Sequence, residues 1–143
     1  MSHLGGIFTR GPGLTFTEAS AVVPEGRITP EDAGIWSDDH AADWAAIVEF
    51  AHSQNQKIGI QLAHAGRKAS TVAPWIKEAV VAGPEANGWP DDVWGPSPLA
   101  FNDAHIVPKE LSKEQIKGLV EAFKIAAVRS IRAGFDVSIA IVE

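Results

Sequence analysis

Hydrophobic and polar residues follow two different periods along the chain, and these periods predict strands that alternate with helices. Over residues 14–23, apolar, aromatic and β-branched residues alternate with polar ones, which indicates a first strand. Ile58, Ile60 and Leu62 repeat a spacing of two in a second strand, so Gln61 points to the opposite face of the sheet. Residues 135–142 predict a third strand.

Two stretches with helical spacing separate these strands. Ser37 marks a helix start, because its hydroxyl accepts orphan amide hydrogens and the acids that follow it favour the positive end of the helix dipole. This helix is predicted to reach about His52, with an apolar stripe of Trp44, Ile47, Val48 and Ala51. A second helix begins with a capping box formed by Ser112 and Gln115 and ends at Gly134. Its apolar stripe consists of Ile116, Leu119, Val120, Phe123 and Ala127.

The remaining segments predict connections. Residues 1–13 are rich in glycine and indicate a connection, whereas residues 71–108 carry most of the prolines and three of the five tryptophans. A loop of that length is usually functional or disordered, and its tryptophans favour an ordered one. The order strand, helix, strand, long loop, helix, strand predicts a right-handed parallel α/β arrangement.

Composition narrows the functional classes. A chain of 143 residues with 45% hydrophobic and 21% charged residues is typical of one globular domain. A net charge of -6 without a basic cluster argues against nucleic acid and anionic membranes as partners. The chain has no cysteine, so disulfides and thiolate zinc sites are excluded, and its amino terminus lacks the apolar run of a signal peptide. A cytoplasmic location is the resulting expectation.

Several separated motifs resemble the old yellow enzyme family, in the order in which that family carries them. The longest is Ile-Gly-Ile-Gln-Leu-Ala-His-Ala-Gly-Arg-Lys at residues 58–68. The others are Phe-Thr-Glu-Ala-Ser-Ala-Val (16–22), Pro-Glu-Gly-Arg-Ile-Thr (24–29), Gly-Ile-Trp-Ser-Asp (34–38) and Ala-Gly-Phe-Asp-Val (133–137). Members of this family are flavin-dependent ene-reductases, also called NADPH dehydrogenases.

The resemblance implies a partial (β/α)₈ barrel. A full barrel needs roughly 250 residues, so residues 1–143 are expected to form a single incomplete domain, a fragment of an FMN-binding barrel. We expect about three parallel strands, two main helices and the long loop rich in tryptophan and proline. Two open sheet edges would leave such a fragment marginally stable, or associated into a homo-oligomer through those edges. The resemblance also places the end of a helix within residues 1–13.

The same resemblance implies FMN as cofactor, NADPH as reductant and an activated alkene as substrate. Gln61 would match the edge of the flavin's pyrimidine ring, since a carboxamide both donates and accepts hydrogen bonds. Ala19 corresponds to a small residue beside the flavin, where a larger side chain would crowd the ring. The alternatives are a satisfied polar residue inside the barrel for Gln61 and ordinary core packing for Ala19.

His64 and Arg67 are candidate substrate-side residues, expected on a loop at the carboxyl end of the second strand, where parallel α/β folds place their chemistry. For His64 a hydrogen bond to backbone is favoured over proton transfer. Arg67 can attract an anion or clamp the loop through an acidic residue, and the clamp is favoured; Arg27 has the same two alternatives. The scattered histidines lack metal-ligand spacing, so no metal site is predicted.

Parts of the family's catalytic machinery have no counterpart in this sequence. The family's histidine pair, or histidine and asparagine, follows Gly-Phe-Asp-Val, but here Ile141 takes the first position. The chain contains no tyrosine, which is the family's usual proton donor. No catalytic residue is therefore assigned.

The alternative function is a non-catalytic fragment that acts as a packing or assembly partner. The divergence of the sequence from the family after Val137 suggests an unspliced intron in the gene.

Another kind of barrel enzyme is less consistent with the residues. An aldolase would need a lysine in a desolvated environment that favours a Schiff base, and neither Lys57 nor Lys68 shows a sign of one.

Overall fold

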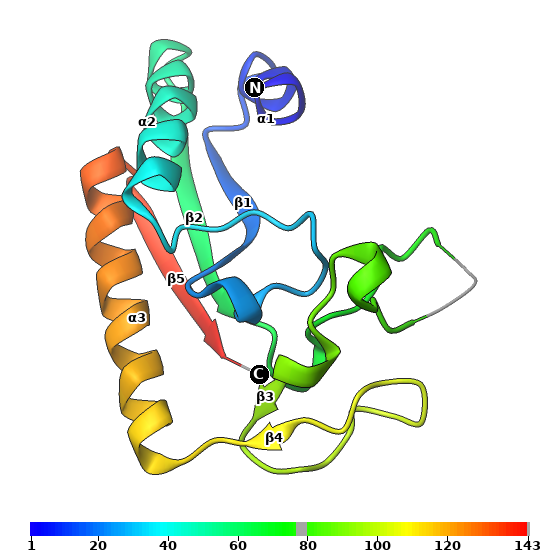
Figure 1. Cartoon of the computed structure of the whole chain (residues 1–143). Coiled ribbons are helices and arrows are strands. Elements are labelled where there is room, and N and C mark those ends of the chain that lie inside the picture. The colour runs from blue at the N-terminus through cyan, green and yellow to red at the C-terminus, as the bar shows by residue number, and fades with distance from the viewer. Residues whose placement is uncertain (77–79, 143) are drawn as a thin grey trace.

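Three parallel strands form the sheet that organises the chain (Figure 1). The computed structural model describes residues 1–76 and 80–142. The strands are β1 (Leu14–Ala21), β2 (Lys57–His64) and β5 (Val137–Val142), in the spatial order β1-β2-β5. All three predicted strands are confirmed, although the first ends two residues earlier and the third begins two residues later than the pattern indicated.

Two long helices pack side by side against one face of this sheet (Figure 1). α2 (Asp38–Ser53) begins after Ser37, whose Oγ accepts from the His40 amide at 3.2 Å. α3 (Lys113–Ala133) carries the predicted capping box and ends at Gly134, which has a left-handed φ of 94°. Both helices match the sequence prediction closely, because their caps and apolar stripes are local signals.

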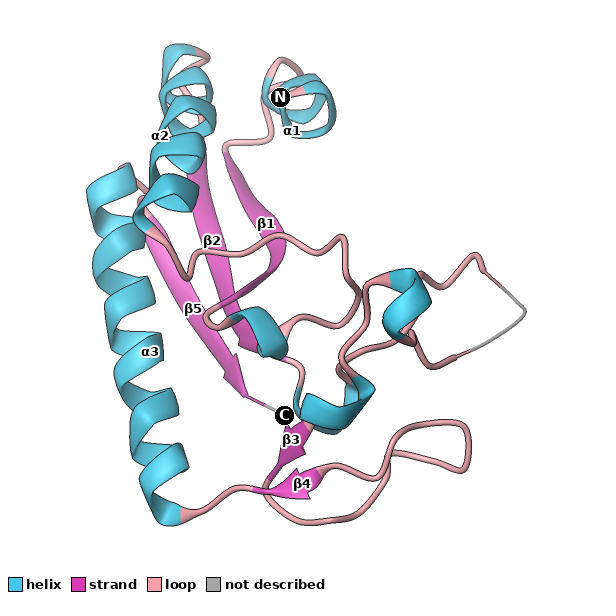
Figure 2. Cartoon of the chain, viewed as in Figure 1, coloured by secondary structure: helices cyan, strands magenta, loops and turns pink. Residues whose placement is uncertain are grey.

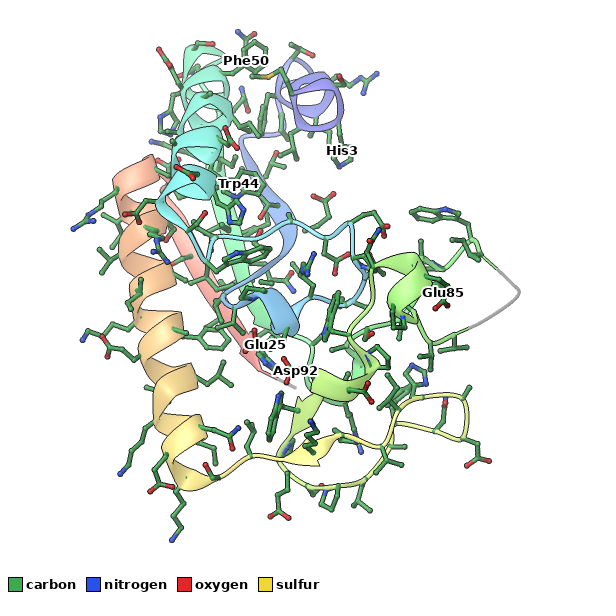
Figure 3. All side chains as sticks on the ribbon, viewed as in Figure 1. His3, Glu25, Trp44, Phe50, Glu85 and Asp92 are labelled. Atoms are coloured by element: carbon green, nitrogen blue, oxygen red, sulfur yellow. The ribbon has the colours of Figure 1, made fainter. Side chains whose placement is uncertain are left out.

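The hydrophobic core lies between these helices and the sheet. Ile58 and Ile60 are fully buried there, and Leu62 is nearly so. Trp44 of α2 packs edge-on against Phe135 with ring centroids 5.6 Å apart (Figure 3). The even-numbered residues Ile58, Ile60 and Leu62 of β2 therefore face the core, and the odd-numbered residues of this strand face the other side of the sheet.

The amino-terminal segment differs from the expectation drawn from its composition. Residues 2–8 form the helix α1 (Ser2–Phe8) rather than a connection, as the family resemblance implied. Leu4 and Phe8 are buried, and the Phe8 ring lies 6.4 Å from that of Phe50 (Figure 3). Burial of these side chains stabilises a helix that its two glycines disfavour.

The described parts of the long loop form an ordered structure beyond the carboxyl ends of β2 and β5 (Figure 2). Residues 77–79 of the predicted loop lie outside the described residues. β3 (Trp94–Gly95) and β4 (Lys109–Glu110) pair in parallel within and after the loop. Short 3₁₀ helices also occur in the connections: Pro24–Gly26 follows β1, Gly66–Lys68 follows β2, and Pro84–Ala86 and Pro90–Asp92 lie within the long loop.

One carboxylate joins the amino-terminal ends of β2 and β5. Asp136 accepts from Lys57 Nζ at 2.8 Å, His52 Nε2 at 2.9 Å and the Ile58 amide at 3.0 Å. Its desolvation raises the pKa of Asp136, but the hydrogen bonds from Lys57, Ile58 and His52 outweigh that effect and hold the pKa well below its usual range.

In the described part of the chain, no helix is long and apolar enough to cross a membrane.

Candidate functional site

Strand register arranges the side chains of the inner face, the sheet face opposite α2 and α3, in three rows. β1 pairs with β2 and β2 pairs with β5, with one irregularity between Phe16 and Ala19. Each row takes one residue from each strand: Phe16, Gly59 and Val137; Ala19, Gln61 and Ile139; Ala21, Ala63 and Ile141. Gln61 is thus the central residue of these three rows and the single polar residue among them.

A cavity of ≈ 180 Å³ lies at the carboxyl end of this face. Its strand side is formed by residues of the second and third rows and by His64, and its loop side by residues of the segment 26–32. The strand residues are Ala19, Ala21, Gln61, Ala63, His64 and Ile141. The tertiary structure therefore brings the predicted residues Ala19, Gln61 and His64 to one site.

Gln61 is one of the residues that line this cavity. The side chain is half-buried, and it forms no hydrogen bond to any residue that the structure describes. A carboxamide offers two donors and an accepting oxygen in one plane. The group is therefore available to the edge of a flat ligand that alternates carbonyl and N–H groups.

Ala19 is the register partner of Gln61 on the neighbouring strand. Its methyl group leaves space beside the carboxamide, and both residues line the cavity. The preceding Glu18 lies outside this lining and forms a hydrogen bond with His3, with 2.7 Å between Oε1 and Nε2 (Figure 3).

Gly59 lies in the first row, below the cavity. A glycine inside a strand often marks a place where another group approaches the backbone closely. In the structure the Phe16 ring lies over it, so that a Cβ on Gly59 would overlap the ring. The close approach is therefore made by a side chain of the neighbouring strand.

His64 is the last residue of β2 and is 5% exposed, which corrects its expected position on a loop. Its Nδ1 accepts from the Gly66 amide at 3.0 Å, so the neutral ring carries its proton on Nε2. Burial lowers the pKa of His64, because the charged imidazolium is poorly solvated there. This contact is the backbone hydrogen bond that the sequence favoured.

Arg67 does not share the cavity with the other predicted residues. It is exposed in the 3₁₀ helix Gly66–Lys68, and its guanidinium carbon lies 5.8 Å from the centroid of the Phe101 ring. The contact that the structure shows is with an aromatic ring rather than with the acidic residue that was expected. The strand turns into this short helix after Ala65, which carries the Arg67 side chain away from the inner face.

Arg27 clamps its loop, which is one of the two alternatives that the sequence left open for it, but it does so through backbone oxygens rather than through an acidic residue. It lines the cavity and donates to the backbone oxygens of Pro24 at 2.8 Å and Pro30 at 2.7 Å. Its guanidinium also lies between two rings, 4.5 Å from the centroid of Trp89 and 5.3 Å from that of Trp36. These contacts fix the loop that forms one wall of the cavity.

Asp32 is a cavity residue that sequence reasoning missed. It accepts from the Ile28 amide at 2.7 Å, the Thr29 amide at 3.1 Å and the Thr29 hydroxyl at 2.7 Å. The spacing of Thr29 and Asp32 is a local turn signal that indicates this arrangement. The carboxylate therefore acts on its own loop.

None of the three loop tryptophans lines the cavity, and Trp89 and Trp94 form hydrogen bonds that fix loop segments. Trp89 Nε1 donates to the backbone oxygen of Glu25 at 3.0 Å, and the Trp89 amide donates to Ser70 Oγ at 2.8 Å. Trp94 donates to Asp92 at 2.7 Å, whereas Trp75 is 80% exposed. Trp89 also packs against the buried side chains of Ala65, Ala69 and Val93.

Ile141 lines the cavity in the row next to Gln61. This is the position at which the family resemblance expects the first histidine of the pair. An isoleucine offers no hydrogen-bond donor, so this side of the cavity is apolar.

Among the described residues, no group of three or more His, Cys, Asp or Glu is placed to hold a metal ion.

Comparison with known families decides which proteins this arrangement is related to. The sequence profile of the NADH:flavin oxidoreductase / NADH oxidase family matches residues 9–142. The chain belongs to this family. The match includes all three strands of the sheet and every residue of the cavity, so the old yellow enzyme resemblance of the separate motifs is confirmed.

Individual relatives agree with the family assignment. An NADH:flavin oxidoreductase of Gibberella zeae is 54% identical over 138 residues, which are 96% of this chain and 33% of the relative. An NADPH dehydrogenase of Bacillus subtilis is 46% identical over 125 residues, covering 87% of this chain and 32% of the relative. The chain thus spans about a third of the length of these relatives.

Solved structures of the family confirm the fold as part of a barrel. Morphinone reductase superposes with a TM-score of 0.73 at 28% identity, over 96% of this chain and 38% of the other. The crystal structure of TcOYE with pHBA gives a TM-score of 0.77 at 26% identity, over 97% and 41%. The three parallel strands and their helices therefore form a partial (β/α)₈ barrel, as predicted.

Proposed function

We propose that this chain contributes part of the flavin pocket of an FMN-dependent NAD(P)H oxidoreductase of the old yellow enzyme type. In the complete protein, FMN would accept hydride from NADPH and pass it to an activated alkene. The proposed substrate class and reductant are inferred from the family. The chain spans about a third of the length of the relatives that it matches. The cytoplasmic location expected from the sequence stays a prediction.

The pairing of Ala19 with Gln61 carries the proposal. The two residues are register partners on β1 and β2, line one cavity, and combine a small side chain with a carboxamide that no described residue engages. Such a group fits the pyrimidine edge of a flavin, which presents alternating acceptors and donors. The N–H groups of the Gln61 carboxamide would stabilise the negative charge that this edge of the flavin gains on reduction.

Other cavity residues have supporting roles. The methyl group of Ala19 keeps space for the plane of the ring, and Arg27 holds the loop wall through the Pro24 and Pro30 oxygens. Neutral His64 fixes the turn after β2 through the Gly66 amide. None of these residues is assigned proton transfer.

Titration of the purified 143-residue chain with FMN tests the proposal. We expect saturable quenching of flavin fluorescence, lost in Gln61→Leu, which removes the amide at nearly constant volume, and in Ala19→Leu, which fills the space. Arg67→Lys, outside the cavity, is the matched control and should bind like the parent chain. Absence of binding by the parent chain, or equal binding by Gln61→Leu, would contradict the proposed pocket.

A second candidate function is a non-catalytic fragment that acts as an assembly partner. Ile141 favours it, because the cavity has an isoleucine where the family resemblance expects a histidine that hydrogen-bonds the substrate. Addition of NADPH to the FMN-loaded chain separates the two functions. Bleaching of the flavin absorption band would support an oxidoreductase, and binding without bleaching would support the assembly partner.

A further inference from the structure

Ser70 is a buried serine whose backbone has a conformation that serine seldom adopts. Its φ of 57° lies in the left-handed region, which favours glycine, and the residue is fully buried. Ser70 follows the short helix Gly66–Lys68 and does not line the cavity. Residues kept in a disfavoured conformation cluster at functional sites, so the contacts of Ser70 indicate where to look for its role.

The hydroxyl of Ser70 joins separate parts of the long loop. Its Oγ donates to Ala82 O at 2.9 Å and accepts from the Trp89 amide at 2.8 Å. The backbone oxygen of Ser70 also accepts from the Ala82 amide at 2.8 Å. A glycine would suit the left-handed backbone but has no hydroxyl, so it could form neither of the two Oγ contacts.

The residue after Ser70 attaches the long loop to the wall of the cavity. The Thr71 amide and the Thr71 hydroxyl both donate to Ile28 O, at 2.8 Å and 3.1 Å. Ile28 lines the cavity, and its own amide donates to Asp32 Oδ2 at 2.7 Å. The backbone of Ile28 is thus held from both sides, and the contact with Thr71 depends on the direction that Ser70 gives to the chain.

Trp89 forms a second attachment to the same wall. Its Nε1 donates to Glu25 O at 3.0 Å, and its ring centroid lies 4.5 Å from the guanidinium carbon of Arg27. Arg27 lines the cavity, and Glu25 precedes the lining residue Gly26. Because the Trp89 amide donates to Ser70 Oγ, this second attachment also depends on Ser70.

We propose that Ser70 is a positioning residue for the cavity: through Thr71 and Trp89 it fixes the wall formed by residues 26–32, without touching the ligand itself. The wall and the strands enclose one cavity, so a displacement of the wall changes the space beside Gln61. A flat ligand packed there would lose contacts, because dispersion attraction falls steeply with distance. The effect of Ser70 on FMN affinity rests on the proposed function, whereas its effect on the wall does not.

The competing explanation is that Ser70 stabilises only the long loop. The wall has contacts of its own that do not involve Ser70, since Asp32 accepts from the Ile28 amide and Arg27 donates to two backbone oxygens of its loop. If these contacts alone fixed the wall, removal of the Ser70 hydroxyl would loosen the long loop and leave Ile28 in place. The position of Ile28 therefore separates the two explanations.

Heteronuclear NMR of the 143-residue chain tests the proposal without a ligand. In Ser70→Ala, hydrogen exchange of the Trp89 indole N–H should rise roughly tenfold, the effect of losing one buried hydrogen bond, and the methyl resonances of Ile28 should shift. Ser70→Gly, which suits the left-handed backbone, should show the same changes and guards against loss of folding. Ser130→Ala is the matched control, because this buried hydroxyl donates only within its own helix, to Ala127 O at 2.8 Å. It should leave both signals as in the parent chain.

FMN titration of the same variants measures the effect on binding. Both Ser70 variants should weaken binding by roughly two- to thirtyfold, the range for a residue that acts on a site without touching it, and Ser130→Ala should not. If the parent chain binds no FMN, the proposed function fails, and the Ile28 resonances still decide the role of Ser70. Unchanged Ile28 resonances, exchange that rises equally throughout the sheet, or unchanged affinity in variants of a parent chain that binds FMN would each overturn the proposal.

Discussion

The imidazole of His64 packs directly against the backbone of Gly26, so closely that a Cβ on Gly26 would lie 2.8 Å from His64 Cδ2. The neighbouring Ala65 amide donates to Gly26 O at 2.8 Å. These contacts join the loop after β1 to the end of β2 at the wall of the cavity. The close approach requires a glycine at position 26 for steric reasons, since its φ is not in the left-handed region.

The first prediction concerns this glycine. Gly26→Ala should lower the free energy of unfolding by about 1–3 kcal/mol, because the buried His64 ring must shift. Gly118→Ala is the matched control: a Cβ at this position of α3 would meet open space, so the change should stabilise by about 0.5–1 kcal/mol. Urea unfolding measures both. A loss in both variants, or in neither, would contradict the steric explanation.

The second prediction concerns the acceptor on His64. His64→Phe leaves the buried Gly66 amide without its acceptor and should cost about 1–3 kcal/mol of stability, whereas His64→Asn retains an acceptor near Nδ1 and should cost less. Burial lowers the pKa of His64 in the folded chain. Its contribution is therefore complete above the unfolded pKa of about 6.5 and declines as the pH falls below it.

The measurement for His64 is urea unfolding at several pH values between about 5 and 8, the range around its unfolded pKa. The parent chain should lose stability relative to His64→Phe as the pH falls through this range. If the difference between the two chains were independent of pH, the burial of a neutral imidazole would not be the cause.

The third prediction concerns the carboxylate of Asp136, which joins β2 to β5. Asp136→Asn should cost about 1–2 kcal/mol near pH 7, since partly exposed charged hydrogen bonds contribute modestly. The folded pKa is lowered, so the stabilisation is complete above the unfolded pKa of about 3.9 and is lost as the pH falls below it. Unfolding free energies of both chains should converge in acid, and a constant difference would count against this interpretation.

The fourth prediction separates the two arginines near the site. Arg27→Lys should cost about 1–3 kcal/mol, because a lysine cannot reach both proline carbonyls while lying between two tryptophan rings. Arg67→Lys, exposed beside one ring, should change stability by less than about 0.5 kcal/mol. Urea unfolding followed by tryptophan fluorescence measures both, and equal losses would show that the clamp is not specific to Arg27.

Local signals in the sequence determined the strands and long helices. The capping box of Ser112 and Gln115, the hydroxyl of Ser37 and the alternation around Gln61 each depend on residues a few positions apart. The motifs also identified the family, because several matches in order leave few alternatives. Residues 2–8 escaped the pattern because their helix depends on burial against α2, which no local signal records.

Only the tertiary structure decided which side chains share the cavity. Strand register places Ala19, Gln61 and Ile141 in adjacent rows although they are far apart in sequence. The turn after β2 buries His64 and carries Arg67 away, and the clamping role of Arg27 depends on backbone carbonyls and on rings from other segments. The sequence by itself determined the elements and the family, because these follow from local periodicity and motif order. The grouping of residues into a site depends on contacts between distant segments, which only folding creates.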